Sequence, residues 1–305
     1  MTKHGAISAA AAYLLWGFFP IYFKLVQAAS PLEILAHRVI WSLLFLALVL
    51  AITRDWRWLP DALRNRHALT IYLGAALLLG ANWFTYIWAV NHDAIIESSL
   101  GYFINPLVSV LLGVTLLRER LRPGQWIPVG IAAMGVIYLT YRYGRLPWIA
   151  LALALTFGLY GLLKKISPLK SNHGLTLETG FLFIPAILYL LALNSQGNLA
   201  FAHRGWTLSL LLALSGAITS IPLILFTAGA QAVPLYLLGM LQYTAPTLQF
   251  LLGVLVYHEP FTLDKLLGFA LVWIALLLYT LEGYLNWQRN KPRQGLEATI
   301  PVLPE

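Results

Sequence analysis

The sequence contains no cysteine and very little charge. Of its 305 residues, only 10% are Asp, Glu, Lys or Arg, whereas 59% are hydrophobic. Without cysteine, neither a disulfide framework nor a thiolate metal site can form, although this absence says little about the compartment. The mean hydropathy of +0.74 lies well outside the range of soluble domains. The composition therefore predicts a polytopic membrane protein.

Signature motifs of enzymes are also absent. The sequence has no HExxH, no GxSxG, no P-loop and no glycine-rich phosphate fingerprint, and its seven histidines lack metal-ligand spacing. We therefore predict no catalytic residues, no cofactor and no metal centre. The net charge of +8 does not predict nucleic-acid binding, because the basic residues lie in short loops between apolar runs.

Long apolar runs fill most of the chain, and a helix needs about 20 such residues to cross a bilayer. The sequence predicts an all-α integral membrane protein with ten transmembrane helices. The predicted spans are residues 5–26, 32–52, 68–90, 95–117, 124–141, 146–163, 175–193, 206–229, 233–256 and 263–285. The tail 287–305, with its Lys, Arg and Pro, is predicted to be disordered.

The basic residues divide unequally between the two sets of loops. With a cytoplasmic N terminus, most of them lie inside: Lys3, Arg54, Arg57, Arg64, Arg66, Arg118, Arg120, Arg122, Lys164, Lys165, Lys170, Arg289, Lys291 and Arg293. The outside set is smaller: Lys24, Arg142, Arg145, Arg204 and Lys265. Because positive charge favours the cytoplasmic side, this bias predicts that both termini are cytoplasmic.

The stretch from Glu97 to Arg122 recurs in distorted form later in the chain. A shift of 140 residues aligns Pro106 with Pro246, Leu111 with Leu251, Leu112 with Leu252, Gly113 with Gly253, Val114 with Val254 and Glu119 with Glu259. A shift of 141 residues aligns Gly17 with Gly158 and Lys24 with Lys165. We interpret this pattern as a duplication rather than a chance match of leucine-rich segments. It predicts two five-helix repeats, over residues 1–143 and 144–286.

Repeats of five spans must cross the membrane in opposite directions. Inverted repeats of this kind have two alternative packings of similar energy and bind their solute near the midplane between the halves. The duplication therefore predicts alternating access.

Polar residues on three spans are candidates for the wall of such a site. In span 95–117, one helical arc of about 140° holds Glu97, Ser98, Gly101, Tyr102, Asn105 and Ser109. Asn82 and Tyr86 share a face of the third span, and Gln242, Tyr243 and Gln249 surround Pro246 in the ninth. Amides and aromatic rings bind amphipathic organic molecules. The alternative is helix packing through small and hydrogen-bonding residues.

Two prolines lie inside predicted spans. Pro106 and Pro246 each remove an intrahelical hydrogen bond and free a carbonyl group. Each is a candidate hinge, while a simple kink or a ligand site at the freed carbonyl are the alternatives.

Arg38 is predicted to lie about six residues, or ~9 Å, inside the second span. An arginine at that depth needs a carboxylate or carbonyl partner, and the nearest candidates are Glu97 and Glu33. A buried carboxyl group holds a proton more readily, so either glutamate is a candidate proton carrier, with a plain salt bridge as the alternative. The other charged residues at span edges are expected to snorkel to the interface: Lys24, His37, Lys165, Glu178 and Glu282.

Several short motifs resemble those of a known family. They are Trp16-Gly17 with Pro20 and Tyr22-Phe-Lys24, His37-Arg38-Val-Ile-Trp41, Asn82-Trp83, Ile87-Trp-Ala-Val-Asn91, Glu97 with Ser99-Leu-Gly-Tyr-Phe-Ile-Asn-Pro106, and Gln242-Tyr243 with Pro246-Thr-Leu248. Over residues 5 to 285 the chain resembles the EamA family of the drug/metabolite transporter superfamily. Its departures are Arg118-Glu119-Arg120 and His258-Glu259-Pro260, where the wider family has a Gly-Glu-Arg type of exit.

The resemblance implies a bacterial inner-membrane carrier and leaves its substrate open. We predict a secondary active transporter, an exporter of a small organic metabolite or drug, with proton coupling as an option that depends on Glu97 and Glu33. Its expected partners are the solute and membrane lipid, and it acts as a monomer or homodimer. The alternatives are a non-transporting partner or sensor and a membrane-embedded enzyme. The predicted substrate-binding residues are Trp16, Arg38, Asn82, Tyr86, Glu97, Tyr102, Asn105, Gln242 and Tyr243.

Overall fold

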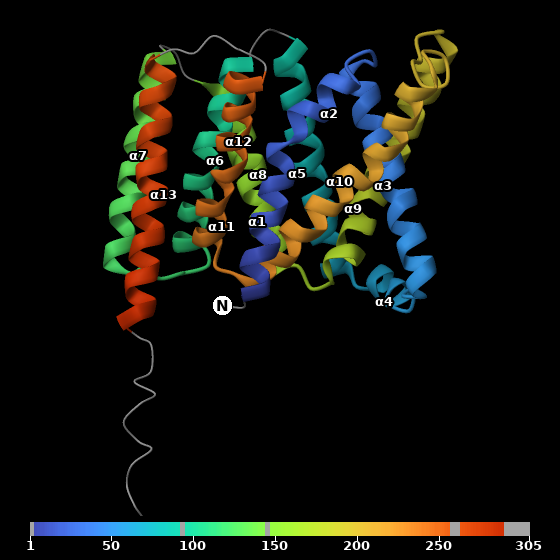
Figure 1. Cartoon of the computed structure of the whole chain (residues 1–305). Helices are drawn as coiled ribbons and strands as arrows, with labels where there is room; N and C mark the ends of the chain where they lie inside the picture. Colours follow the sequence, from blue (N-terminus) through green and yellow to red (C-terminus); the bar gives the residue numbers. More distant parts are fainter. Residues whose placement is uncertain (1–2, 92–94, 144–146, 257–262, 290–305) are drawn as a thin grey trace, which may run out of the picture.

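The computed structural model is a bundle of helices and describes residues 3–91, 95–143, 147–256 and 263–289 (Figure 1). Every regular element in these ranges is helical. The elements are α1 (Lys3–Gly17), α2 (Phe19–Leu25), α3 (Pro31–Thr53), α4 (Leu59–Arg64), α5 (Arg66–Asn91), α6 (Ile95–Thr115), α7 (Pro123–Tyr143), α8 (Trp148–Ile166), α9 (Ser171–Ser195), α10 (Trp206–Ala232), α11 (Leu235–Gln242), α12 (Thr244–Leu251), the π-helix η1 (Leu252–Val256) and α13 (Leu263–Arg289).

These elements confirm the ten predicted spans. The first span is broken into α1 and α2, the ninth is broken into α11, α12 and η1, and the short α4 lies between α3 and α5. In the described ranges, seven helical segments are long and apolar enough to cross a membrane. The remaining spans are α6, α7 and the broken ninth. The chain is therefore an all-α, multi-pass membrane protein.

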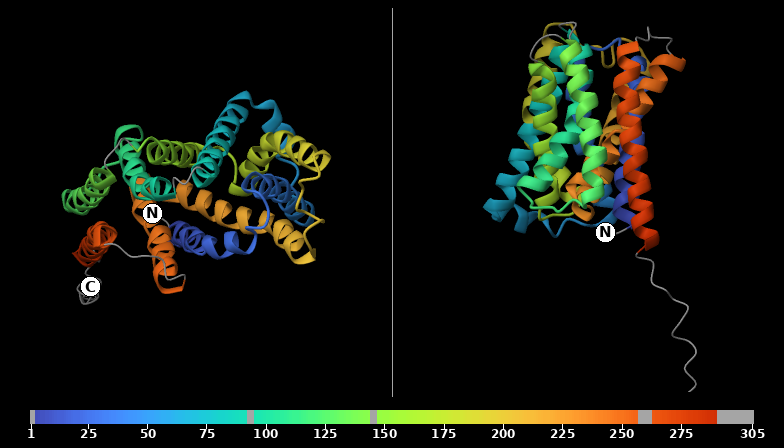
Figure 2. Two further views of the ribbon diagram at one scale, coloured as in Figure 1. Left: turned by 90° about the horizontal axis from the view of Figure 1, so that it is seen from above. Right: turned by 90° about the vertical axis from the view of Figure 1, so that its left-hand side faces the viewer.

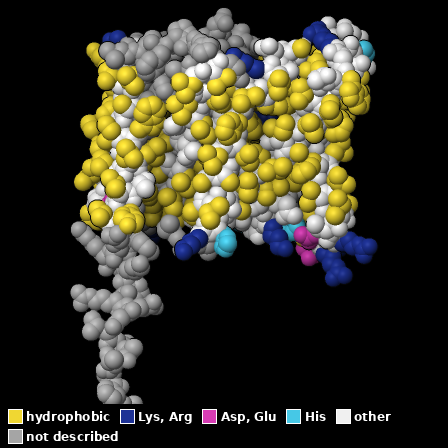
Figure 3. Space-filling view, in the orientation of Figure 1, with side chains coloured by type: hydrophobic (Ala, Val, Ile, Leu, Met, Phe, Trp, Pro, Cys, Tyr) yellow, Lys and Arg dark blue, Asp and Glu magenta, His cyan; other side chains and the backbone are white. Residues whose placement is uncertain are grey.

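The outer surface of the bundle is apolar. Hydrophobic side chains cover the visible face between the two ends, and the Lys and Arg side chains gather at those ends (Figure 3). Ile52, Ile137 and Leu255 are among the large apolar side chains that stay exposed. Trp148 and Trp206 are exposed at the first residue of their helices, as expected of aromatic residues at a membrane interface. This surface suits contact with lipid.

Helices of the two halves pack in pairs that follow the predicted inversion. The contact of α1 with α10 in one direction corresponds to the contact of α8 with α5 in the other, because the first span is equivalent to the sixth and the third to the eighth. In the same way, the contact of α1 with the broken ninth span, α11 and α12, corresponds to the contact of α8 with α6, the fourth span. Three further pairs join equivalent spans: α3 with α9, α6 with α11, and α7 with α13. The last pair, α7 and α13, stands at one edge of the bundle (Figure 2). The fold is therefore two inverted five-helix halves. The repeat boundary at residues 143/144 stays a prediction, and the predicted disordered tail lies outside the described residues from residue 290 onward.

Two glycines allow neighbouring helices to cross backbone to backbone. A Cβ atom on Gly216 of α10 would overlap the main-chain carbonyl of Trp41 on α3. A Cβ atom on Gly239 of α11 would lie 2.6 Å from the carbonyl oxygen of Pro106 on α6. Because neither carbonyl belongs to a flexible side chain, these positions fix α10 on α3 and α11 on α6.

Glu33, one of the two candidate partners of Arg38, is bonded to other groups. Glu33 Oε1 accepts hydrogen bonds from the backbone N–H groups of Ala200 and Phe201, each at 2.9 Å. The carboxylate therefore ties the first turn of α3 to the loop between α9 and α10. At the opposite end, His173 in the first turn of α9 lies 2.8 Å from Asp55 in the connection after α3. Residues 33 and 173 differ by the repeat offset of 140, so the two contacts are inverted counterparts.

The Glu33 contact yields a stability prediction. Glu33→Ala leaves two backbone donors without their acceptor and is expected to lower the free energy of unfolding by about 3 kcal/mol. Glu33→Gln retains an acceptor oxygen but loses the charge, so it should lower the free energy of unfolding by less than Glu33→Ala does. Thermal unfolding of the detergent-solubilised variants measures both effects. Equal losses for the two variants, or no loss in either, would contradict this role.

The expectation of snorkelling is wrong for His37 and Glu178, whose side chains are buried, whereas Lys165 and Glu282 are only partly buried. Glu178 pairs with Lys164 inside the bundle, at 2.5 Å. Glu282 accepts from Arg122 Nη2 at 2.6 Å, and Lys165 donates to two carbonyl oxygens at the end of α10. Lys164 was predicted to be a loop residue because the sixth span was expected to end at residue 163, whereas α8 continues to Ile166. Of the charges of Glu178, Glu282 and Lys165, only the first is held inside the bundle by a fully buried counter-charge.

Candidate functional site

A cavity of about 150 Å³ lies between the two halves of the bundle. Its walls come from α1, α2, α3, α5 and α6 of the first half and from α8, α10, α11 and α12 of the second. Leu153 and Phe157 of α8 line it, and both precede the last turns of that helix, which lead to the end that carries the N terminus. A concave, largely apolar space with a few polar groups is the usual form of a small-molecule site.

The structure brings most of the predicted binding residues to this one cavity. Tyr243 does not line it, because its buried hydroxyl donates to the carbonyl oxygen of Phe103 at 3.3 Å. Glu97 is outside the residues whose side chains the structure describes. That the others bind a solute stays a prediction. The predicted residues on the cavity wall are Trp16, Arg38, Asn82, Tyr86, Tyr102, Asn105 and Gln242.

Aromatic residues of the first span complete the wall and were not predicted. Tyr13, Phe19 and Phe23 line the cavity beside Trp16. Their spacing of three or four residues is the signal that could have identified them, because it places them on one face of a helix.

Arg38 is held on the cavity wall by a hydroxyl group and by rings. Its Nε donates to Thr219 Oγ1 at 3.0 Å. Its guanidinium carbon lies 4.5 Å from the ring centroid of Trp83, and 5.8 Å and 5.6 Å from those of Phe19 and Phe23. Such cation–π contacts partly compensate for the lost hydration of the charge. In the described part of the chain, Thr219 is the only hydrogen-bond partner of Arg38, so its two terminal nitrogens are available to a ligand.

The amide side chains on the cavity wall differ in how many of their polar atoms already have a hydrogen-bond partner. Asn82 Nδ2 donates to the carbonyl oxygen of Leu153 and to Thr156 Oγ1, both at 2.9 Å, so this residue joins α5 to α8 and lines the cavity as well. Among the described residues, the buried Asn105 Oδ1 and the hydroxyl of Tyr13 have no hydrogen-bond partner. A buried polar atom without a partner is costly, and a bound solute or water removes that cost.

Proline residues mark the two broken spans. Pro20 lacks the N–H that would bond the carbonyl of Trp16, and Gln249 Nε2 donates to that carbonyl at 3.1 Å instead. The ninth span is interrupted at Tyr243, three residues before Pro246, whereas Pro106 lies within the continuous α6. Pro246 also lines the cavity, and Pro106 does not. The hinge role of both prolines stays a prediction.

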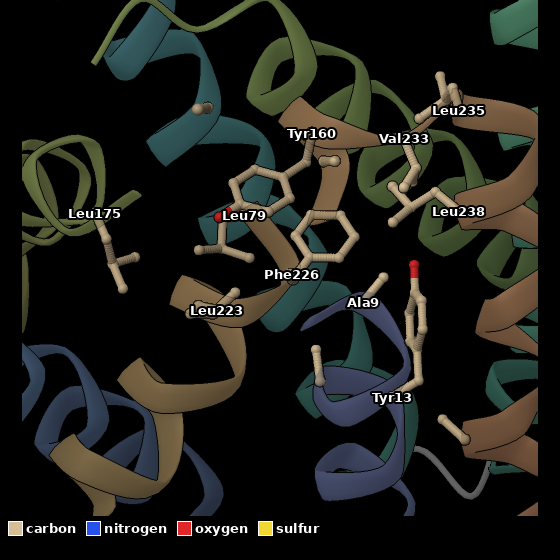
Figure 4. Close-up of a cluster of buried hydrophobic side chains, with 14 of the residues drawn as sticks. Ala9, Tyr13, Leu79, Tyr160, Leu175, Leu223, Phe226, Val233, Leu235 and Leu238 are labelled. Carbon is tan, nitrogen blue, oxygen red and sulfur yellow. The ribbon is translucent and has the colours of Figure 1, made fainter. Parts of the chain in front are cut away.

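Packed rings close the cavity toward the end that carries the N terminus. Phe226 lies 5.5 Å from Trp16, 5.4 Å from Phe157 and 5.9 Å from Tyr160, measured between ring centroids. Figure 4 shows the rings of Tyr160 and Phe226 side by side within the buried cluster. A solute can pass toward that end only if these rings separate.

A solute-sized cavity between two inverted five-helix halves is the architecture of a membrane transporter. Comparison with known proteins agrees, because the model of the EamA-like transporter family matches residues 3–141. The chain belongs to this family. It is 48% identical to "Uncharacterized transporter YojE" of Bacillus subtilis (strain 168), over 94% of this chain and 97% of the relative. It is 44% identical to "Protein RarD" of Streptomyces exfoliatus, over 99% of this chain and 95% of the relative.

The fold also has a counterpart among solved structures. A crystal structure superposes with a TM-score of 0.69 at 21% sequence identity, covering 93% of this chain and 100% of the other. At this identity the likeness concerns the fold alone.

Proposed function

We propose that this protein is a secondary active transporter that exports a small organic solute across the bacterial inner membrane by alternating access. The observation that carries the proposal is a cavity that residues of both inverted halves line together. The excess of Lys and Arg at one end supports an orientation with both termini in the cytoplasm. In this proposal the chain moves its solute without changing it chemically.

The wall of the cavity suggests the chemistry of the solute. Arg38 offers terminal donors to a carboxylate or another oxygen acceptor. The rings of Trp16 and Trp83 suit an apolar or aromatic body, and Asn105 and Gln242 provide further hydrogen bonds. A small amphipathic metabolite or drug fits this combination. Coupling to protons is part of the proposal.

A ligand screen with a matched double variant tests the proposal. A solute that binds only the folded protein raises its stability, by about 2.7 kcal/mol at 100 times the Kd. We expect amino acids, other small metabolites or drugs to include one that raises the unfolding midpoint. Asn105→Ala combined with Gln242→Ala should abolish that shift and the transport of the same solute into liposomes. Tyr141→Ala, on the exposed surface, is the control and should leave both intact.

Two outcomes would count against the proposal. Transport that is unchanged in the Asn105→Ala, Gln242→Ala double variant would exclude this cavity as the binding site. A solute that binds but is never moved in liposomes would favour a sensor or partner subunit.

A further inference from the structure

A fully buried ion pair lies beyond the ring cluster, toward the end that carries the N terminus. Lys164 Nζ of α8 and Glu178 Oε1 of α9 are 2.5 Å apart, and neither side chain has any exposed surface. The hydroxyl of Tyr160 donates to the other carboxylate oxygen at 3.1 Å. Ionised side chains inside a membrane bundle are costly to bury and commonly mark a functional site.

The pair is connected to the floor of the cavity through Tyr160. The ring of Tyr160 stacks on Phe226, and Phe226 contacts Trp16 on the cavity wall. A movement of α8 away from α10 separates the rings of Tyr160 and Phe226 and also shifts α8 against α9. Because the carboxylate of Glu178 is bonded to two side chains of α8, that shift strains or separates the ion pair.

The other groups that face the pair are neutral or are paired elsewhere. Tyr72 of α5 places its ring 5.4 Å from Lys164 Nζ, and its hydroxyl accepts the backbone N–H of Leu169. Thr227 of α10 adjoins Tyr160. On α9, His173 is bound to Asp55 and stacked on Trp58. Among the described residues, the charge balance of this site therefore depends on Glu178 and Lys164.

We infer that Glu178 is a proton-binding site that controls opening of the cavity toward the N-terminal end. With the gate closed, Lys164 neutralises the carboxylate. Once the pair separates and water enters, Glu178 binds a proton from the water on that side. Reclosure would then bury the Lys164 cation without a counter-charge, which is unfavourable, so protonation holds the gate open. The inference rests on the proposed alternating access and identifies a proton as a ligand of the gate.

Thiol labelling from one side of the membrane tests this inference. The native chain has no cysteine, so Leu223→Cys provides a single probe in the cavity. His4→Cys, exposed at the N-terminal end, identifies the side and corrects for the pH dependence of thiol reactivity. In the Leu223→Cys protein, the corrected rate of labelling from that side should rise as the pH falls from 8 to 4.5, because a hydrated carboxyl group titrates at about pH 4.3. Adding Glu178→Gln should raise the rate by about tenfold at pH 8, because Lys164 loses its counter-charge, and should remove the pH dependence.

A second substitution separates gating from misfolding. Glu178→Gln with Lys164→Met removes both charges, so closure should return and labelling should be slow at every pH. If the Glu178→Gln protein does not accumulate, the parent and the double variant are compared instead. The inference then requires that the labelling rate depends on pH in the parent and not in the double variant. A Glu178→Gln rate like that of the parent, or a double variant that keeps the parental pH dependence, would overturn the inference. If Leu223→Cys is never labelled from this side in any variant, alternating access itself fails.

Discussion

Arg38→Gln is expected to reduce transport of the solute by about 100-fold or more while leaving the protein folded. Truncating one partner of a buried charged contact costs about 2–5 kcal/mol, and 2.7 kcal/mol corresponds to about 100-fold in affinity. Arg38 contributes a charge whose terminal nitrogens have no acceptor among the described residues, so the lost contact would be with the solute. The fold should tolerate the change, because the rings around the guanidinium still pack against the amide.

The comparison with lysine refines this prediction. Arg38→Lys keeps the charge but loses both the planar contact with Trp83 and the hydrogen bond from Nε to Thr219, so we expect partial transport. Uptake into proteoliposomes, with the unfolding temperature recorded for each variant, measures the effect. Arg54→Gln, on the exposed surface, is the matched control. Full transport in a folded Arg38→Gln protein would show that the solute does not use this side chain.

Gly216→Ala is expected to destabilise the fold by about 3 kcal/mol or more. The added methyl group would overlap the main-chain carbonyl of Trp41, and overpacking against a rigid backbone forces the two helices apart. The same shift would disturb the hydrogen bond from Ser42 Oγ to the carbonyl oxygen of Gly216, at 3.3 Å. Thermal unfolding in detergent, together with the yield of folded protein, measures the loss.

A second glycine in a helix is the control for this prediction. A Cβ atom on Gly180 of α9 would meet nothing within 4 Å. Because alanine favours a helix over glycine by about 1 kcal/mol, Gly180→Ala should be neutral or slightly stabilising. If both variants had the same stability, the crossing of α10 and α3 would not be as tight as described.

The spans and the cavity wall were predictable because lipid imposes simple rules. Apolar runs of membrane length identify helices, and polar side chains inside a membrane must face other helices or water. From that rule we predicted that Asn82, Asn105 and Gln242, on three different helices, line one cavity, and all three lie on its wall. The duplication added the inversion, which the packing of α3 on α9 and of α7 on α13 confirms.

The partners of individual side chains were not predictable from depth alone. Glu33 and Arg38 lie on the same helix, but five residues correspond to about 140° of rotation, so they face different neighbours. Tyr243 follows Gln242 by one residue and for the same reason lies on another side of the helix, against Phe103. The bond from Gln249 to the carbonyl of Trp16 joins residues 233 positions apart, and no local pattern reports it.

The most direct test of alternating access is two-sided labelling of one cavity position. A single cysteine at Leu79, which lines the cavity, is exposed in the otherwise cysteine-free chain to a membrane-impermeant thiol reagent applied separately to each face of sealed membranes. Alternating access predicts labelling from both faces, with the solute slowing the reaction from each. Labelling from one face only, at every pH and with or without solute, would contradict a cavity that opens alternately to the two sides.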